Sequence, residues 1–403
     1  MSDGEIIQVD VSEDRFHRLR QIPWWDQSRL RASRALVLGA GALGNEIVKN
    51  LALVGVGTVT IVDFDRVENS NLSRSVLFSS GDEGRLKCEV AADAARRIYP
   101  DIQAQGLNTD IIFGLGWGWY LDADIVLTGL DGREARLAAN RACIFSKRPL
   151  FDGAIEGIDG VVRTFCGWQG PCYECTMSER DWELIHRRRS CNLLSRDEMV
   201  GGHVPTTSTI SSVVAALQVQ QAVKHLHGLD VQAGRGIIFN GLAFEAHSVE
   251  YQQPNDCYAH EVPDTIEQLP WSASTTTVLD ALTEAGRRLG DQVVLELRMD
   301  IVTERLCAHC GFRDAPLSAL LKLRQGDGLC STCGDRLDLR TTRQIDTASP
   351  FVRETLARLG IPSYDIMTFR SGQRRWHVLL NGDGRQPNPA TTECLSAPDG
   401  DHT

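Results

Sequence analysis

The fold of this chain is decided by residues 35–63, which read ALVLGAGALGNEIVKNLALVGVGTVTIVD. The apolar run before the glycines and the run that ends at Asp63 are typical of buried parallel strands, and the apolar spacing between them is typical of a helix. Gly39, Gly41 and Gly44 open that helix, where glycines let the backbone approach a phosphate chain, and Asp63 can accept ribose hydroxyls. Glycines that serve only close strand-to-helix packing are the alternative. The complete strand-turn-helix-strand-acid order favours a nucleotide site of the dinucleotide-binding kind.

Strands and helices continue to alternate after this unit. Residues 124–128 predict another buried strand and 133–145 another helix, so we expect an α/β fold with a doubly wound, Rossmann-like, mostly parallel sheet. From about residue 151 the pattern changes. The sheet is expected to continue into antiparallel strands at 160–165, 236–239 and 243–249, and residues 205–228 predict one long helix with capping residues at its start.

The remaining stretches divide the chain further. Residues 1–33 form a polar N-terminal arm, and residues 180–202 are charged and without periodicity, which predicts a long mobile loop. Residues 264–380 predict a smaller C-terminal α+β region, with helices at 278–289 and near 351–359 and a strand at 376–380. Residues 381–403 are rich in Gly, Pro, Asp and Thr, which predicts a disordered tail.

Composition excludes several classes of protein. The 403 residues carry 42 Lys+Arg against 53 Asp+Glu, a net charge of −11, and 42% are hydrophobic, which is typical of a soluble globular protein of two or three domains. An acidic chain is not expected to bind nucleic acid or anionic lipid non-specifically. We find no apolar run of about 18 residues, the length that a membrane-spanning helix needs, so a cytoplasmic location is the default expectation.

The twelve cysteines indicate metal binding. Two residues between ligands let both side chains reach one tetrahedral ion from a tight turn, which favours zinc over disulfides in a cytoplasmic chain. The candidate ligands are Cys172, Cys175, Cys257, His260, Cys307, Cys310, Cys330 and Cys333. The last four have the spacing of a zinc ribbon, and they complete the ion without His309, which is expected to be exposed or to lie behind the ligands. Cys88 and Cys143 are expected in the core.

The residues after Asp63 distinguish between classes of nucleotide-binding protein. They read DFDRVENSNLSR at 63–74, GRLK at 84–87 and LDG at 130–132, followed by Arg136 and Asn140. This ordered set resembles the adenylating domain shared by ubiquitin-activating (E1) enzymes and the bacterial ThiF/MoeB proteins. The resemblance covers roughly residues 14–262 and implies an adenylation domain at 34–263 with a crossover loop at 180–204. Nicotinamide dehydrogenases, the competing class, do not carry this set.

The resemblance implies a role for each matching residue. ATP would be held by Gly39, Gly41, Gly44, Asp63 and Asp65, and its triphosphate would be contacted by Ser70, Asn71, Arg74 and Lys87. Asp131 would hold Mg²⁺, and Arg18 would reach the phosphates of the neighbouring subunit in a homodimer. Fixed cations and a metal suit adenylation, because negative charge builds on the phosphoryl oxygens when a carboxylate attacks the α-phosphorus.

Four features depart from or refine the family's pattern. Ser75 stands where a Gln is usual, Gly132 replaces the usual Asn, and the arm around Arg18 does not end in Gln. By resemblance, Cys172, Cys175, Cys257 and His260 form the family's structural zinc site, with His260 in place of the usual fourth Cys. Together with the zinc ribbon, this gives two expected Zn²⁺ ions.

Cys191 is the candidate nucleophile. It follows Arg187, Arg188 and Arg189 in the predicted loop, and neighbouring arginines favour the thiolate. The hypothesis is that Cys191 attacks the acyl-adenylate and carries a ubiquitin-like protein as a thioester for an E2-like partner. A bystander cysteine is the alternative, and His203 in the same loop is a weaker candidate for assistance.

The sequence leaves several functions open. The leading hypothesis is an E1-like enzyme that adenylates the C-terminal glycine of a ubiquitin-like protein, with a bacterial antiviral role as an extension. The second is a sulfur-carrier-protein adenylyltransferase without a thioester step. The third is a binding scaffold with an inert nucleotide fold, against which Arg74, Lys87 and Asp131 speak.

Overall fold

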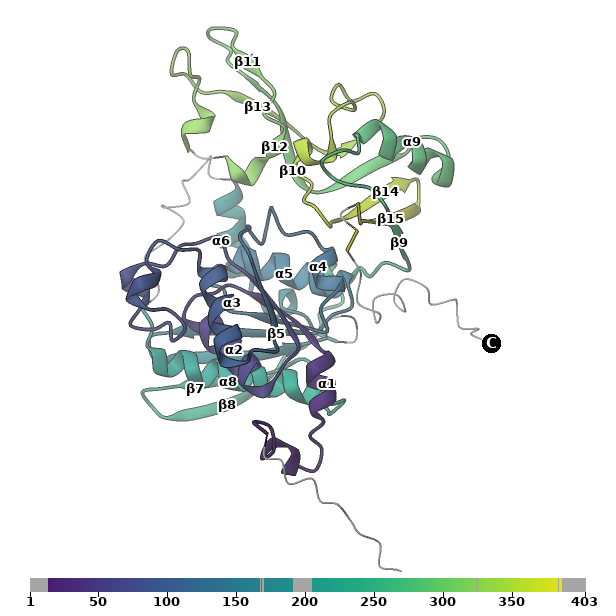
Figure 1. Ribbon diagram of the computed structural model, residues 1–403. Helices are drawn as coiled ribbons and strands as arrows, with labels where there is room; N and C mark the ends of the chain where they lie inside the picture. The colour runs from purple at the N-terminus through teal and green to yellow at the C-terminus, as the bar shows by residue number, and fades with distance from the viewer. Residues whose placement is uncertain are drawn as a thin grey trace, which may run out of the picture.

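The computed structural model describes residues 14–166, 168, 170–190, 205–323, 325–382 and 384–385. These residues form two units, each built around its own sheet (Figure 1). In the described part of the first unit, eight strands follow the order β3-β2-β1-β4-β5-β6-β7-β8. Their bounds are β1 Arg34–Leu38, β2 Thr58–Val62, β3 Gln103–Leu107, β4 Ile125–Thr128, β5 Leu150–Glu156, β6 Asp159–Phe165, β7 Arg235–Asn240 and β8 Glu245–Glu250.

The first sheet is parallel from β3 to β5 and antiparallel from β5 to β8, which confirms the predicted fold class. Its helices are α1 Gln27–Ala32, α2 Ala42–Val54, α3 Lys87–Ile98, α4 Gly118–Leu121, α5 Arg133–Phe145, α6 Glu179–Ser190 and α8 Ser208–Leu226. Alternate residues of β1 face different cores. Val37 packs with α2, α3 and α8 on one face, and Leu36 packs with α4 and α5 on the other. The order in which strands are added to the sheet reverses between β1 and β4, because β2 and β3 lie on one side of β1 and β4 lies on the other. Folds of this α/β type bind ligands at such a point.

Helix α6 corrects the loop prediction for residues 180–190. Ser178 and Asp181 cap its start, because the Ser178 amide donates to the Asp181 carboxylate at 3.0 Å and the Asp181 amide donates to Ser178 Oγ at 3.3 Å. Ile185 is buried in the core beneath α4 and α5. Because most residues of this stretch are charged, the sequence did not indicate that the segment has a buried apolar contact and reciprocal cap hydrogen bonds. Residues 191–204 of the predicted loop lie outside the described residues.

The second unit extends from β9 to β15 and has its own core. Its elements are β9 Ile266–Leu269, α9 Val278–Leu289, β10 Val294–Leu306, β11 Arg313–Asp314, β12 Ser318–Ala319, β13 Asp338–Ile345, β14 Ile366–Ser371 and β15 Arg374–Leu380. Helix α9 packs its apolar face on β10, β14 and β15. The sequence also predicts a helix near 351–359, and this is wrong except for a short 3₁₀ turn at Leu356–Leu359. The carbonyls of Val352 and Glu354 instead accept from the first amides of α9.

The two units meet at the segment around α4. The amide of Gly118 donates to the Tyr364 carbonyl at 2.9 Å, and the Trp117 amide donates to the Asp365 carboxylate at 2.9 Å. A Cβ at Gly118 would lie 2.6 Å from the Tyr364 carbonyl oxygen, so this contact requires glycine. Arg298 pairs with the second oxygen of Asp365 at 2.8 Å. The hydrogen bonds of Gly118 and Trp117 therefore hold the second unit against the first, and the ion pair with Arg298, which lies inside the second unit, orients the Asp365 carboxylate for this contact.

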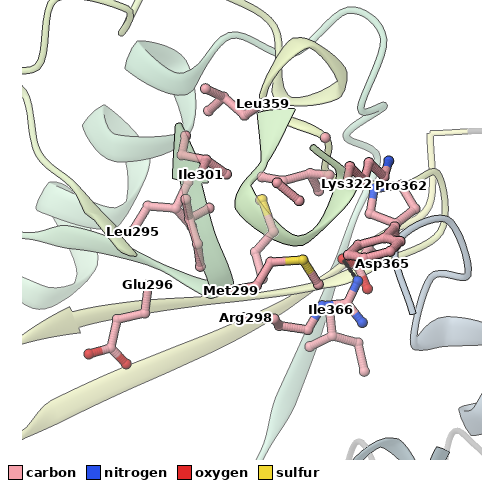
Figure 2. A pocket seen from close by; sticks show the side chains of 16 residues that line it. Leu295, Glu296, Arg298, Met299, Ile301, Lys322, Leu359, Pro362, Asp365 and Ile366 are labelled. Carbon is pink, nitrogen blue, oxygen red and sulfur yellow. Dashed lines mark hydrogen bonds and ion pairs between the residues drawn. The ribbon is translucent and has the colours of Figure 1, made fainter. Parts of the chain in front are cut away.

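A small cavity lies beside this contact (Figure 2). Its volume is about 50 Å³, and Phe113 of the first unit lines it together with Arg298, Asp365 and apolar residues of β10 and β14. Lys322 of the second unit lies 5.3 Å from the centre of the Phe113 ring. The lining includes none of the predicted site residues, so the cavity belongs to the contact between the units.

At the start of the predicted disordered tail, the Asn381 amide donates to Leu269 and the Gly382 amide to Trp271, so the described start of that tail belongs to the second unit. Strand β3 was not predicted, because only Ala104 among its five residues is buried. Among the described helices, we find none that combines the length and apolar character needed to cross a membrane.

Candidate nucleotide and metal sites

The glycine loop between β1 and α2 provides the centre of the candidate nucleotide site. Gly39 has a φ of 91°, and a Cβ there would lie 2.6 Å from the Gly129 carbonyl oxygen. A Cβ at Gly44 would overlap the carbonyl of Gly39, so both positions need glycine for packing alone. A Cβ at Gly41 would meet nothing within 4 Å. Packing does not explain Gly41, and the open space at the N-terminus of α2 suits a phosphate group.

Asp63 lies at the carboxyl end of β2, beside the glycine loop. Its carboxylate accepts from the amide of Ala40 at 2.7 Å and from the amide of Asp65 at 2.8 Å, one bond to each oxygen. These bonds fix its orientation and leave a further lone pair on each oxygen. Burial raises the pKa of Asp63 above its usual range, against the opposing effect of the Ala40 amide. The carboxylate lies beside the glycine loop, and its role in accepting ribose hydroxyls stays a prediction.

Two cations of the segment from Asp65 to Lys87 are predicted site residues. Lys87 begins α3, and its Nζ lies 3.0 Å from Asp65 Oδ2 while its amide donates to the Asp65 carbonyl at 2.9 Å. Arg74 donates to the carbonyl of Ser70 at 2.7 Å. Asn71 is buried and accepts from the Glu68 amide at 3.0 Å, which closes the 3₁₀ turn at Asn69–Asn71. Local hydrogen bonds therefore shape the segment, and both predicted cations are held by groups of the segment itself.

Asp131 lies in the turn between β4 and α5. The side chain is exposed, and Gly132 forms the N-cap of α5. The turn lies against the glycine loop, because a Cβ at Gly39 would be 3.3 Å from a methyl carbon of Leu130. The structure thus brings the glycine loop, Asp63 and the Asp131 turn together at the carboxyl ends of β1, β2 and β4. The oxygen donors of such a turn suit Mg²⁺.

Four side chains form the first metal cluster: Cys172, Cys175, Cys257 and His260. Their donor atoms all lie within 4.8 Å of one another, and Cys175 Sγ is 3.2 Å from His260 Nε2. Residues 85 positions apart in the sequence therefore converge on one point. Three thiols and one imidazole are a donor set that zinc accepts in tetrahedral structural sites.

The second metal cluster contains Cys307, Cys310, Cys330 and Cys333. Cys307 Sγ is 3.4 Å from Cys333 Sγ, and Cys310 Sγ is 3.4 Å from Cys330 Sγ. His309 is outside the cluster and lies 3.5 Å from the Asp335 carboxylate, with 72% of its side chain exposed. The sequence prediction that four cysteines complete this site without His309 agrees with this geometry.

The other predicted site residues lie elsewhere. Cys191 and His203 are outside the described residues. Arg18 is exposed on the N-terminal arm, whose Phe16 is buried against Gly55 at the C-terminus of α2. That is the end of α2 remote from Gly41. Within one chain the structure therefore does not bring Arg18 to the glycine loop, and its role across a dimer stays a prediction.

A buried charge cluster next to the Asp131 turn was not predicted from the sequence. Asp152 of β5 is fully buried between Arg136 of α5 and Arg163 of β6. The available signal was a charged residue in a predicted strand. This signal does not indicate burial, because strand residues that face solvent are often charged as well.

Comparison with known proteins identifies the family. The family model described as ThiF family matches residues 14–259. The chain belongs to the ThiF family. This confirms the resemblance inferred from the motifs, and the match ends before the second sheet begins.

The relatives of this ThiF-family chain include E1 enzymes and adenylyltransferases. The SAMP-activating enzyme E1 of Haloferax volcanii is 30% identical over 266 residues, which cover 63% of this chain and 90% of that protein. The molybdopterin-synthase adenylyltransferase of Escherichia coli is 28% identical over 259 residues, covering 64% and 97%. The sulfur carrier protein ThiS adenylyltransferase of E. coli is 28% identical over 232 residues, covering 57% and 87%.

A solved structure supports the fold independently. The crystal structure of E. coli MccB with ATP aligns with a TM-score of 0.52 at 22% identity, covering 62% of this chain and 75% of that chain. At this identity the alignment shows that the two chains share a fold.

Proposed function

We propose that this chain is an ATP-dependent adenylyltransferase that activates the C-terminal glycine of a ubiquitin-like or sulfur-carrier protein. The observation that carries the proposal is the grouping of the glycine loop, Asp63 and the Asp131 turn at the carboxyl ends of three parallel strands. The named relatives support the same class of reaction, since each is an adenylyltransferase or an activating enzyme.

The proposed reaction uses residues of this chain in defined roles. A carboxylate oxygen of the carrier protein attacks the α-phosphorus of ATP, a new P–O bond forms, and pyrophosphate leaves with the electron pair of the broken bond. The attacking carboxylate is already ionised, so no general base is needed. Arg74 and Lys87 stabilise the negative charge that builds on the phosphate oxygens. A magnesium ion held by Asp131 would supply further positive charge to the leaving pyrophosphate.

The finer proposal is an E1-like cycle. The thiolate of Cys191 attacks the carbonyl carbon of the acyl-adenylate, AMP leaves, and the resulting thioester passes to an E2-like partner. This step rests on the sequence around Cys191, namely the arginines that precede it. A homodimer in which Arg18 serves the neighbouring site, zinc in both clusters and a role in antiviral defence belong to the same proposal.

The alternative is sulfur-carrier activation without a thioester. The coverage of 87% and 97% of the two E. coli adenylyltransferases supports it, as the 90% coverage of the Haloferax volcanii enzyme supports the E1-like cycle, because each match includes nearly the whole of the relative. In this case the acyl-adenylate itself is the product that the next protein uses, and Cys191 has no part in its formation.

Intact-protein mass spectrometry separates the two cycles. The protein is incubated with ATP, Mg²⁺ and a β-grasp carrier that ends in glycine, with and without a thiol reductant. An E1-like cycle predicts a reductant-sensitive adduct of the carrier's mass, which Cys191→Ala abolishes. The control is Cys394→Ala, at a cysteine of the predicted C-terminal tail, and it should retain the adduct. Formation of carrier-AMP alone, unchanged in Cys191→Ala, would establish the adenylyltransferase without a thioester. Absence of both products with every carrier of this class would contradict the proposed function.

A further inference from the structure

We propose that the first metal cluster positions the Asp131 turn through a buried network formed by Tyr173, Arg163, Asp152 and Arg136. The inference rests on the proposed function, in which Asp131 holds the magnesium ion of ATP. It assigns these four side chains as positioning residues, and it gives the metal cluster a role in the nucleotide site beyond holding its own loop together.

The network begins at the turn itself. Arg136 of α5 donates to the carbonyl of Leu130, the residue directly before Asp131, and to the carbonyl of Gly153 at 2.7 Å. Its guanidinium also pairs with Asp152. One side chain therefore connects the turn after β4 to the next strand, β5. Because only 7% of the Arg136 side chain is exposed, its bonds are shielded from competing water.

Asp152 holds the centre of the network. Its Oδ1 accepts from Arg136 and from Thr128 Oγ1 at 2.7 Å, and Thr128 is the last residue of β4 before the turn. Its Oδ2 lies 3.3 Å from the Arg163 guanidinium. No part of the Asp152 side chain is exposed. A buried carboxylate between two guanidiniums fixes both sides, because the loss of its charge would leave two buried cations without a partner.

The network ends at the metal cluster. The Arg163 guanidinium lies 5.4 Å from the ring centre of Tyr173 and interacts electrostatically with its phenol group. Tyr173 directly follows the ligand Cys172, so a change in the ligand loop moves the ring on which Arg163 rests.

The same loop is bound a second time to the helix that begins after Asp131. The amide of Tyr173 donates to Asn140 Oδ1 at 2.9 Å, and Glu174 accepts two bonds from Arg141 at 2.7 and 3.0 Å. Asn140 and Arg141 are both in α5. The ligand loop therefore holds α5 near its C-terminal half, while Arg136 holds the turn at its start.

The arrangement predicts that Mg²⁺ affinity depends on groups remote from the magnesium ion. Asp152→Asn removes the central charge, Tyr173→Phe removes the hydroxyl that interacts with Arg163, and Glu174→Gln weakens the contact with α5. Binding of Mn²⁺ to the protein with a non-hydrolysable ATP analogue, followed by electron paramagnetic resonance, reads the nucleotide-site metal directly. Total zinc content and the melting temperature are measured on the same samples.

The expected result is a weaker Mn²⁺ affinity, by about tenfold in Asp152→Asn and about threefold in the two milder variants, with the zinc content unchanged. The matched control is Glu284→Gln, a half-buried carboxylate of α9 that is paired with Arg287 and Arg288 and lies in the second unit. It should leave Mn²⁺ affinity unchanged. If Asp152→Asn does not fold, Tyr173→Phe and Glu174→Gln decide the question.

A lower melting temperature in all three variants with an unchanged Mn²⁺ affinity would overturn the inference, since the network would then act on stability alone. Asp131→Asn separates this from a failure of the proposed function. If Asp131→Asn also binds Mn²⁺ normally, Asp131 is not the metal ligand and the proposed function is contradicted. If it binds Mn²⁺ more weakly while the network variants do not, the network is at fault.

Discussion

The two metal clusters of this protein have similar donors and different surroundings. The first lies inside the ThiF-family unit, where Cys172 is buried and Asn140 and Arg141 connect its loop to α5. The second lies in the outer part of the β10–β13 pair (Figure 1), and its Cys310 and Cys333 are exposed. A spacing of two residues between cysteines therefore predicts a metal site but does not predict the role of that site in the protein. That role follows from what surrounds the ligands.

Removal of each cluster in turn gives the largest expected difference. Cys172→Ser should lower the melting temperature of the first unit by about 10 °C or more and abolish adenylation, because a structural metal contributes several kcal/mol to the fold that holds the nucleotide. Cys330→Ser should disturb the ribbon and leave carrier adenylation within about twofold of the original rate. Calorimetry and a pyrophosphate-release assay measure both. Equal losses of activity in the two variants would show that the two clusters do not differ in their importance for adenylation.

A second prediction concerns the contact that joins the units. Asp365→Asn should lower the free energy of unfolding of the second unit by about 3 kcal/mol, because Arg298 then lies partly buried without its partner. Urea titration followed by tryptophan fluorescence reports this contact, since Trp117 and Trp119 lie at it. The control is Asp338→Asn, an exposed residue of β13. If both variants unfold at the same urea concentration, the ion pair does not stabilise the second unit.

The smallest expected effect is a pH dependence of the second unit. Burial lowers the pKa of His377 to about 4, and its ring lies edge-on to Phe145 of the first unit. The unfolded chain binds a proton at this residue near pH ~6.5 and the folded chain does so only near pH 4. The stability that depends on neutral His377 is therefore complete above the unfolded pKa and is lost as the pH falls towards 4.

At pH 5 the loss should be about 2 kcal/mol relative to pH 7. His377→Asn should flatten the dependence of unfolding free energy on pH between 7 and 4, while His247→Asn, with an exposed histidine, should leave it unchanged. Chemical denaturation at a series of pH values measures both. A dependence that survives in His377→Asn would assign the titration to another group.

The sequence predicts those parts of the molecule whose signals are local. The glycine loop, Asp63 and the eight metal ligands each follow from spacing within one short stretch, and the structure places them as expected. Strand β3 and helix α6 were not predicted, because each buries few side chains and most of its residues are polar. The Asp152 network could not be predicted, since its members come from α5, β5 and β6 and meet only after the sheet has formed.

In the proposed function, the glycine loop and the Asp131 turn form an adenylation site. The most direct test of this proposal is the exchange of radiolabelled pyrophosphate into ATP in the presence of a carrier protein that ends in glycine. We predict exchange that requires both the carrier's terminal glycine and Mg²⁺, and that falls by at least about a hundredfold in Asp131→Asn. Exchange without a carrier, or an undiminished rate in Asp131→Asn, would contradict the account.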